Sequence, residues 1–275
     1  MKNLFLITIV LLSFHKSFSQ AKISISDAIN IAGRQRMLGQ RMAKDKVYLA
    51  ADVNSTEAKK ELEYTISIFQ NGLKILKDFA PTDLIKSRVE EEEKTFNVYK
   101  TYILDDSKKA MQIVVNTNTI FLKICDNLVI EILEYAKQQP LNNINIPNKN
   151  LELKIPEATN IAGELRYLTQ RLTLYYAINN YHIKNISPSE IDKIIKTLDK
   201  NINYLTALDI NTLKIEEEIN DIRIDWMKLK KGIYKDEKID FEAKKINPIK
   251  LYKVCNRILY KANVTAKMYT ELAKS

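Results

Sequence analysis

A polar motif that contains glycine occurs twice in this 275-residue chain, at positions 130 residues apart. Residues 28–42 read AINIAGRQRMLGQRM and residues 158–172 read ATNIAGELRYLTQRL, so nine of fifteen positions are identical. The shared polar and glycine positions are Asn30 and Asn160, Gly33 and Gly163, Arg36 and Arg166, Gln40 and Gln170, and Arg41 and Arg171. Packing of two helices does not require these residue types. The repeat therefore indicates that one polar device is built twice into the chain.

At about 100° per residue, the first motif divides into two helix faces. The apolar face, which we expect to pack in a helical core, is formed by Ile31, Leu38, Met42 and Leu49. The opposite face holds Gly33 and Gln40, with Asn30, Met37 and Arg41 on one side and Arg36 on the other. Glycine inside a helix costs about 0.5–1 kcal/mol relative to alanine, so its recurrence indicates close approach of another helix or a ligand.

An arginine follows each glycine by three residues and offers a planar fork of charged donors. Two such faces packed about a pseudo-twofold axis would bring Arg36 and Arg166 together, and the two cations would repel each other. A small planar oxyanion between them would relieve this repulsion, because its oxygens accept paired N–H donors from both sides. The amides expected to complete the shell belong to Asn30, Asn160, Gln40 and Gln170. We therefore expect an anion pocket, formed either within one chain or between two chains.

The alternative is a structural role for the same motif. Arginine on a helix is most often solvated or paired with a carboxylate, and the motif faces would then simply pack on each other or on a membrane receptor. Arg34 shows that not every polar position is shared, because its counterpart in the second copy is Glu164. We expect both of these side chains to face solvent.

Long helices must position the two motifs, because the chain has only five glycines and six prolines. In the first half, helices are expected at 24–51, 55–79, 82–104 and 107–138. In the second half, they are expected at 157–184, 188–207, 211–233 and 240–273. Ser187 followed by Pro188 is typical of a capped helix start with a first-turn proline.

The similarity between the halves extends beyond the motif. Residues 121–129 align with 251–259 at the same offset of 130, which places Cys125 opposite Cys255. We therefore predict an all-α fold of two tandem four-helix up-and-down bundles that are related by internal duplication and could pack about a pseudo-twofold axis. The predicted units are 21–139 and 157–275, joined by a linker at 140–156 that is rich in asparagine and proline. The two cysteines either pair, if the fourth helices flank one axis, or are separately buried thiols.

The N-terminal 20 residues are typical of a signal peptide: Lys2, an apolar run at 4–14, and small residues at 17–19. We therefore expect a periplasmic or secreted protein; the alternative is an uncleaved N-terminal membrane anchor. The apolar run is shorter than the roughly 20 residues that span a bilayer, and we expect no later segment to be long enough.

Composition argues against several other classes of function. The formal charge of +9 favours anionic partners in general, but no dense basic run or nucleic-acid-binding motif occurs. His182 is the only histidine after the N-terminal segment, so neither a metal site nor a histidine-activated nucleophile is expected. The acidic run 90–93 is expected to be a solvated helix face. We expect no enzymatic activity, no metal and no cofactor.

The motif at 30–42 resembles the signature of the N-terminal sensory domain of type IV pilus methyl-accepting chemotaxis transducers, the PilJ-like domain. It is also similar to the periplasmic motif of nitrate/nitrite sensor histidine kinases. The second copy keeps the glycine and both arginines but has Tyr167 in place of Met37.

The nitrate-sensor resemblance implies a four-helix bundle that dimerises and binds nitrate with one arginine from each motif helix. It therefore implies Arg36 and Arg166 as anion ligands, with Arg41 and Arg171 in support. The expected function is an exported sensory module that binds a nitrate-like or nitrite-like oxyanion. Because the sequence contains no kinase or methylation segment, the expected signalling partner is a membrane receptor or a histidine kinase.

Overall fold

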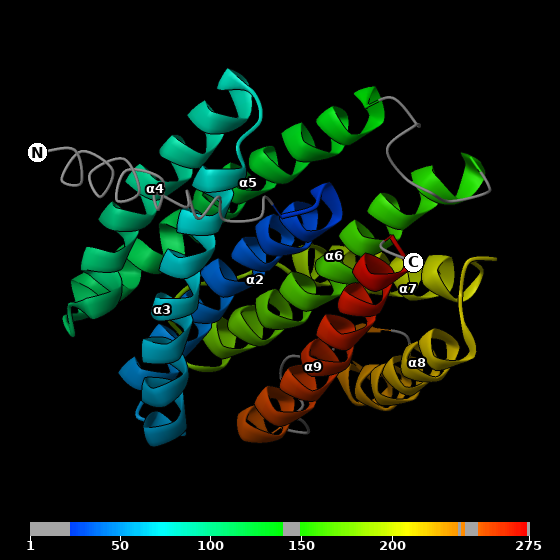
Figure 1. The fold of residues 1–275 in the computed structure, drawn as a ribbon. Helices are drawn as coiled ribbons and strands as arrows, with labels where there is room; N and C mark the ends of the chain where they lie inside the picture. The colour runs from blue at the N-terminus through cyan, green and yellow to red at the C-terminus, as the bar shows by residue number, and fades with distance from the viewer. Residues whose placement is uncertain (1–22, 140–148, 236–237, 240–246, 274–275) are drawn as a thin grey trace, which may run out of the picture.

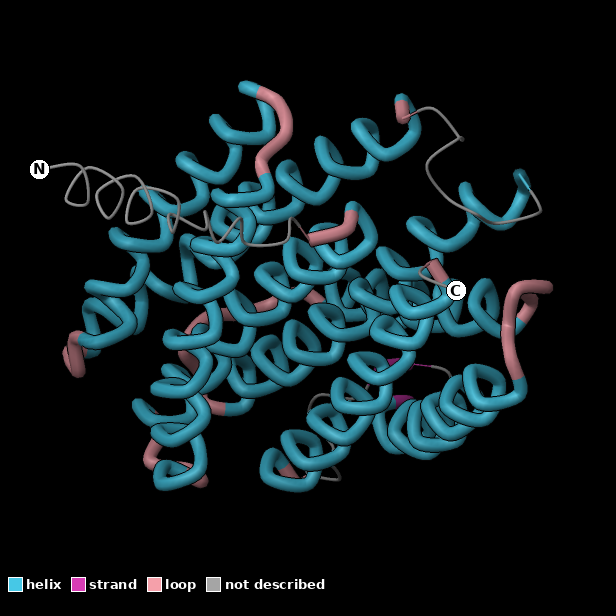
Figure 2. Tube along the Cα trace, viewed as in Figure 1, coloured by secondary structure: helices cyan, strands magenta, loops and turns pink. Residues whose placement is uncertain are grey.

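The computed structural model describes residues 23–139, 149–235, 238–239 and 247–273, and this part of the chain is almost entirely helical (Figure 1, Figure 2). The first half contains α2 (Ile25–Ala50), α3 (Ser55–Phe79), α4 (Asp83–Leu104) and α5 (Lys108–Gln138). The second half contains α6 (Lys149–Asn180), α7 (Pro188–Thr206), α8 (Leu213–Ile233) and α9 (Pro248–Leu272). A two-residue hairpin, β1 (Tyr234–Lys235) with β2 (Lys238–Ile239), follows α8. The predicted all-α fold class is confirmed.

Side-chain caps fix many of the helix starts. Thr82 accepts a hydrogen bond from the backbone N–H of Ile85, and Ser187 forms a reciprocal capping box with Glu190. The bounds of α2, α3, α4, α5, α7 and α8 agree with the predicted ranges to within two residues. Cap residues therefore located the starts of α4 and α7, whereas α3 begins after Asn54 without a side-chain cap.

The start of α6 differs from the prediction. The helix begins at Lys149 and includes Pro156, although 140–156 was expected to be a linker. Proline removes one backbone donor, but burial of Ile155 and Ala158 on either side offsets that loss. Residues 140–148 of the predicted linker, and 240–246 of the last predicted helix, lie outside the described residues.

The helices form two groups of four. In the first group α2 packs on α3, α3 on α4, α4 on α5, and α5 back on α2; α6, α7, α8 and α9 pack in the same order. The two groups meet mainly where α2 lies along α6 (Figure 1). These helices run in the same direction, and Tyr48 near the end of α2 contacts Tyr181 just after α6, with ring centroids 6.2 Å apart. The unit boundaries and the common origin of the two halves stay predictions.

Because α3, α5 and α6 surround α2, this helix is buried on nearly all sides. The predicted division of α2 into one buried apolar face and one opposite polar face is therefore incomplete, because residues on both faces are buried. Arg34 and Glu164 were expected to face solvent, but both are half-buried. Glu164 Oε2 accepts a hydrogen bond from Asn201 Nδ2 at 2.8 Å, so packing of α7 on α6 encloses it.

One described helix, α5, is long and apolar enough to cross a membrane by length and composition, although no such later segment was expected. Its inward face, which includes Phe121, Leu128 and Ile132, is buried in the core of the first group. A core helix passes the same test, so we interpret α5 as part of the bundle. The predicted signal peptide at 1–20 lies outside the described residues.

Candidate anion site between the two motif helices

Arg36 and Arg166 meet where α2 packs on α6, and both side chains are almost fully buried. A Cβ placed on Gly33 would lie 3.3 Å from Arg166 Nη2 and 3.4 Å from Arg36 Nη2. A Cβ placed on Gly163 would lie 3.0 Å and 3.4 Å from the same two atoms. Both glycines therefore face both guanidinium groups, and all four residues come together within one chain.

Each arginine reaches across to the asparagine of the other motif. Arg36 Nη2 donates to Asn160 Oδ1 at 2.7 Å. Arg166 Nη1 donates to Asn30 Oδ1 at 2.9 Å, and its Nη2 donates to the Asn30 carbonyl at 3.3 Å. This reciprocal exchange follows from two parallel helices that carry the same motif at the same level.

The fourth helix of each group adds a different partner. Asp126 of α5 accepts from Arg36 Nη1 at 2.7 Å, whereas Asn263 of α9 accepts from Arg166 Nη1 at 2.9 Å. The Arg36 Cζ also lies 5.2 Å from the ring centroid of Tyr167. Arg36 is therefore paired with a carboxylate, whereas the hydrogen-bond acceptors around Arg166 are neutral.

Sequence reasoning missed Asp126 and Asn263. Asp126 lies in the aligned segment 121–129, opposite Asn256, so a charge difference between the repeats was a usable signal. The counterpart of Asn263 is Leu133, and nothing in the sequence marks that position.

Positive charge exceeds negative charge at this site. Burial, followed by the nearby charges of Arg34 and Arg36, lowers the pKa of Arg166 from 12.5 to about 9. The Nε atoms of Arg36 and Arg166 are buried and have no hydrogen-bond acceptor among the described residues. Buried cations without a full set of partners are costly, and an anion in contact with both guanidinium groups would lower that cost.

The two motif glutamines lie outside this arrangement. Gln40 Nε2 donates to the Asn118 carbonyl of α5 at 3.4 Å, and Gln170 Nε2 donates to Asn256 Oδ1 of α9 at 3.1 Å. No hydrogen bond among the described residues joins either glutamine to Arg36 or Arg166. Both glutamines instead contact the fourth helix of their own group, and Gln40 Oε1 also accepts from Arg171 Nη1 at 3.5 Å.

The second arginine of each motif also points elsewhere. Arg41 Nε lies 3.4 Å from Glu61 Oε1 of α3. Arg171 Nη2 donates to Thr119 Oγ1 of α5 at 3.0 Å and also to the hydroxyl of Tyr175. The motif therefore separates into a central pair, Arg36 and Arg166, and two outer arginines that contact neighbouring helices.

The first motif helix, with the buried Arg36, lies in a segment that matches a known family. Residues 20–99 match the type IV pili methyl-accepting chemotaxis transducer N-terminal family, PilJ. This PilJ segment covers α2, α3 and most of α4, and the match supports a helical sensory module of the transducer type. No curated protein and no solved structure is significantly similar to the chain. The second copy and the nitrate-sensor similarity stay predictions.

The PilJ segment also contains a buried charged cluster that sequence reasoning missed. Lys44 Nζ lies 2.7 Å from Glu61 Oε2 and 3.2 Å from Asp45 Oδ1, over the ring of Tyr252 at 3.8 Å. Burial raises the pKa of Asp45 to about 8 against the opposing effect of Lys44. Burial also raises the pKa of Glu61, but Lys44 and Arg41 lower it by more, to about 2. The cluster joins α2 and α3 to α9.

The acidic run 90–93 was expected to be a solvated helix face, but this prediction is wrong for Glu92. Glu92 is fully buried because it shares the inward face of α4 with Val89 and Phe96, three and four residues away. Burial raises the pKa of Glu92 to about 8, near the Cys125 thiol. Cys125 and Cys255 are both buried and unpaired, so no disulfide joins the fourth helices.

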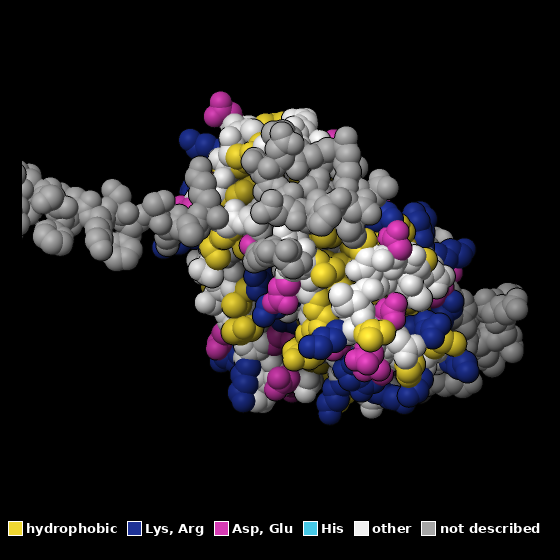
Figure 3. Space-filling model, turned by 45° about the vertical axis from the view of Figure 1, so that its right-hand side comes forward, with side chains coloured by type: hydrophobic (Ala, Val, Ile, Leu, Met, Phe, Trp, Pro, Cys, Tyr) yellow, Lys and Arg dark blue, Asp and Glu magenta, His cyan; other side chains and the backbone are white. Residues whose placement is uncertain are grey.

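Acidic and basic side chains lie side by side on the face shown in Figure 3. Among the described residues, no group of three His, Cys, Asp or Glu side chains is placed to hold a metal ion.

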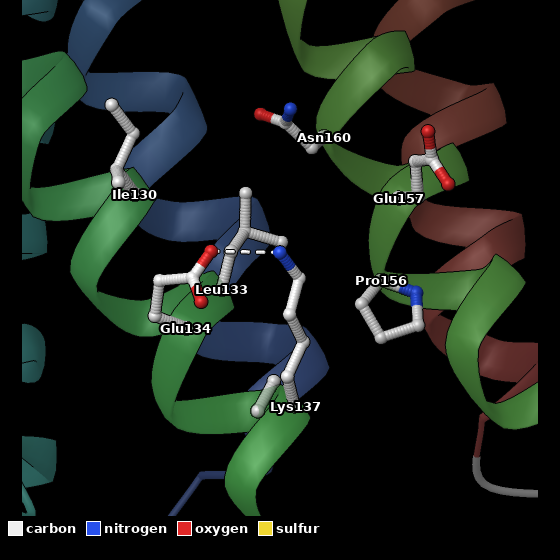
Figure 4. A pocket seen from close by; sticks show the side chains of 8 residues that line it. Ile130, Leu133, Glu134, Lys137, Pro156, Glu157 and Asn160 are labelled. Atoms are coloured by element: carbon white, nitrogen blue, oxygen red, sulfur yellow. Dashed lines mark hydrogen bonds and ion pairs between the residues drawn. The ribbon is translucent and has the colours of Figure 1, made fainter.

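A cavity of about 490 Å³ lies between the end of α5 and the start of α6. Glu134 and Lys137 form an ion pair on one wall, and Pro156, Glu157 and Asn160 lie on the other (Figure 4).

Proposed function

We propose that this protein is an exported sensory module that binds a small oxyanion, such as nitrate or nitrite, between α2 and α6. The observation that carries the proposal is the pair of buried guanidinium groups that face Gly33 and Gly163, with Asp126 as the carboxylate in contact. The PilJ match supports the sensory class independently of that geometry.

Binding would exchange neutral oxygens for anionic ones. Asn30 Oδ1 and Asn160 Oδ1 now accept from the two arginines. If each side-chain amide turned over, its Nδ2 would donate to the anion, and the anion would accept from both guanidinium groups. Arg34, Arg36 and Arg166 contribute three positive charges, and Asp126 and Glu164 contribute two negative ones, so a monovalent anion would neutralise the remainder.

The signal would travel through the fourth helices. An anion at Arg36 competes with Asp126 of α5, and an anion at Arg166 competes with Asn263 of α9. Both helices would therefore shift relative to α2 and α6 on binding. We propose that a membrane receptor or histidine kinase reads this shift outside the cytoplasm.

Calorimetric titration of the mature chain with nitrate and nitrite tests the site. We expect one anion per chain for wild type, and a loss of at least about tenfold in affinity for the Arg36→Ala/Arg166→Ala double variant. Arg223→Ala on the exposed face of α8 is the control for loss of positive charge. Unchanged binding by the double variant, or no binding of either anion by wild type, would refute the oxyanion site and favour a purely structural role.

Asp126→Asn gives the opposite expectation. Removal of the carboxylate that competes for Arg36 should strengthen nitrate binding severalfold, because the site then carries one more uncompensated positive charge. Weaker nitrate binding by this variant would show that Asp126 positions Arg36 for the anion instead of competing with it.

A further inference from the structure

A second cationic cleft, separate from the Arg36 and Arg166 pair, lies among α5, α6 and α7. Its volume is about 320 Å³. Three basic residues line it, one from each helix: Lys123, Arg171 and Lys193. The cleft therefore gathers positive charge from three consecutive helices.

The charges in this cleft are not balanced by the protein. Lys123 and Lys193 are exposed and have no ion pair or hydrogen bond from their side chains among the described residues. Arg171 donates to the neutral oxygens of Thr119, Tyr175 and Gln40. The carboxylate that lines the cleft, Asp126, is held by Arg36 at 2.7 Å. An anion in the cleft would meet three cations and one carboxylate that is already paired.

The first helical group indicates what kind of anion fits. Arg41 is the counterpart of Arg171, and there the protein supplies its own carboxylate, Glu61 of α3. Counted from the first residue of each helix, Glu61 in α3 and Ile194 in α7 hold the same position, and Ile194 lines the cleft. In the first group the carboxylate of Glu61 lies beside Arg41, whereas in the second group an open cleft lies beside Arg171.

We propose that the cleft binds a small organic carboxylate. Its carboxylate would lie beside Arg171, Lys123 and Lys193, as the carboxylate of Glu61 lies beside Arg41 and Lys44. Leu122, Leu168 and Ile194 line the same cleft and would contact the carbon chain. This cleft adjoins the proposed nitrate site, because Asp126 and Tyr167 line the cleft and also contact Arg36.

Titration with butyrate, and with butyramide as its neutral isostere, tests the proposal on the mature chain. We expect saturable butyrate binding and no butyramide binding. Lys123→Ala/Lys193→Ala should weaken butyrate binding by about tenfold, because two of the three cations are removed. Lys109→Ala/Lys200→Ala removes the same charge from exposed positions of α5 and α7 away from the cleft and should bind normally. Equal weakening by both pairs, or no weakening by the first, would overturn the proposal.

A tethered carboxylate gives a second test that keeps both lysines. Thr119→Glu places an acid beside Arg171, as Glu61 lies beside Arg41, and should abolish butyrate binding by competition. Thr119→Gln has the same size without the charge and should keep most of the binding. Equal butyrate affinity of the two variants, with circular dichroism showing both folded, would contradict a carboxylate site at Arg171.

Discussion

Glycine at positions 33 and 163 leaves room for the ends of two arginine side chains. Alanine would favour the helix at either position by about 1 kcal/mol, but its Cβ would crowd Nη2 of both arginines. The chain therefore gives up some helix stability to hold two guanidinium groups between two backbones. This is the close approach that the recurrence of glycine in the sequence predicted.

Gly163→Ala should therefore weaken nitrate binding with little effect on stability. The added Cβ at 3.0 Å displaces Arg166 Nη2, while the helix gains intrinsic propensity. We expect about tenfold weaker binding by calorimetry and a urea midpoint close to that of wild type. Gly39→Ala is the control, because its Cβ would meet the Phe121 ring at 3.1 Å, away from the arginines. A larger loss of nitrate affinity in the control would contradict the prediction.

Glu92 should make stability fall as pH rises. Folding raises its pKa from 4.5 to about 8, so the folded protein keeps a proton that the unfolded chain releases between these values. Its contribution is fully present below about pH 4.5 and is lost as pH rises to about 8, by on the order of a few kcal/mol. Glu92→Gln should flatten this part of the urea-unfolding profile.

The exposed neighbour Glu91 provides the control for this measurement. Glu91→Gln should leave the pH dependence of the unfolding free energy as in wild type. If the profiles of Glu92→Gln and wild type run parallel from pH 4.5 to 8, Glu92 does not titrate with the shifted pKa.

The central arginines could be predicted from sequence because the repeat provided a second, independent copy of the pattern. Arg36, Arg166 and the two glycines were all expected to lie together. Gln40 and Gln170 were expected to contact the same anion, but they contact α5 and α9. A helical wheel shows which face of the helix a side chain is on, but not which neighbouring group it contacts. Asp126 and Lys44 were missed because their roles depend on which helices pack around α2.

At the scale of elements, cap residues made several helix starts predictable, whereas Pro156 led to a wrong predicted start for α6. Ser187 and Thr82 mark helix starts by local hydrogen bonds that the sequence alone determines. The start of α6 depends instead on burial of Ile155, which outweighs the missing donor of Pro156. Tertiary packing of this kind leaves no local signal.

The buried cluster should hold α2, α3 and α9 together. Glu61→Gln leaves Lys44 and Arg41 without their main counter-charge, and we expect destabilisation of about 2–4 kcal/mol in urea unfolding. Lys44→Met combined with Glu61→Gln should cost less than the sum of the two single changes, because the pair is then removed as a unit. Additive losses in the double-mutant cycle would show that the two side chains are not coupled.

At the scale of the whole molecule, the two groups share buried surface and should unfold together. Besides the contact of α2 with α6, Tyr48 donates to the Pro248 carbonyl at 2.9 Å, and Lys44 donates to Asn256 at 3.4 Å. The buried hydrophobic residues of the two groups also belong to one continuous cluster. The two halves are therefore expected to behave as one cooperative unit.

Trp226 provides a probe for this cooperativity, because it is the only tryptophan and lies buried in α8 of the second group. Leu73→Ala, in the core of the first group, should destabilise by about 2–5 kcal/mol and lower the urea midpoint of Trp226 fluorescence by the same amount as that of circular dichroism. The exposed change Lys59→Ala is the control. A tryptophan transition that stays in place in Leu73→Ala would show that the groups unfold independently.

Both arginines of the central pair belong to one polypeptide, and this has a consequence for measurements at low protein concentration. A site shared between two separate subunits empties on dilution as the subunits dissociate, so its apparent affinity depends on how much protein is present. Here the two halves are covalently tethered and cannot diffuse apart. Ligand occupancy at the central pair would then depend on ligand concentration alone, down to a single molecule.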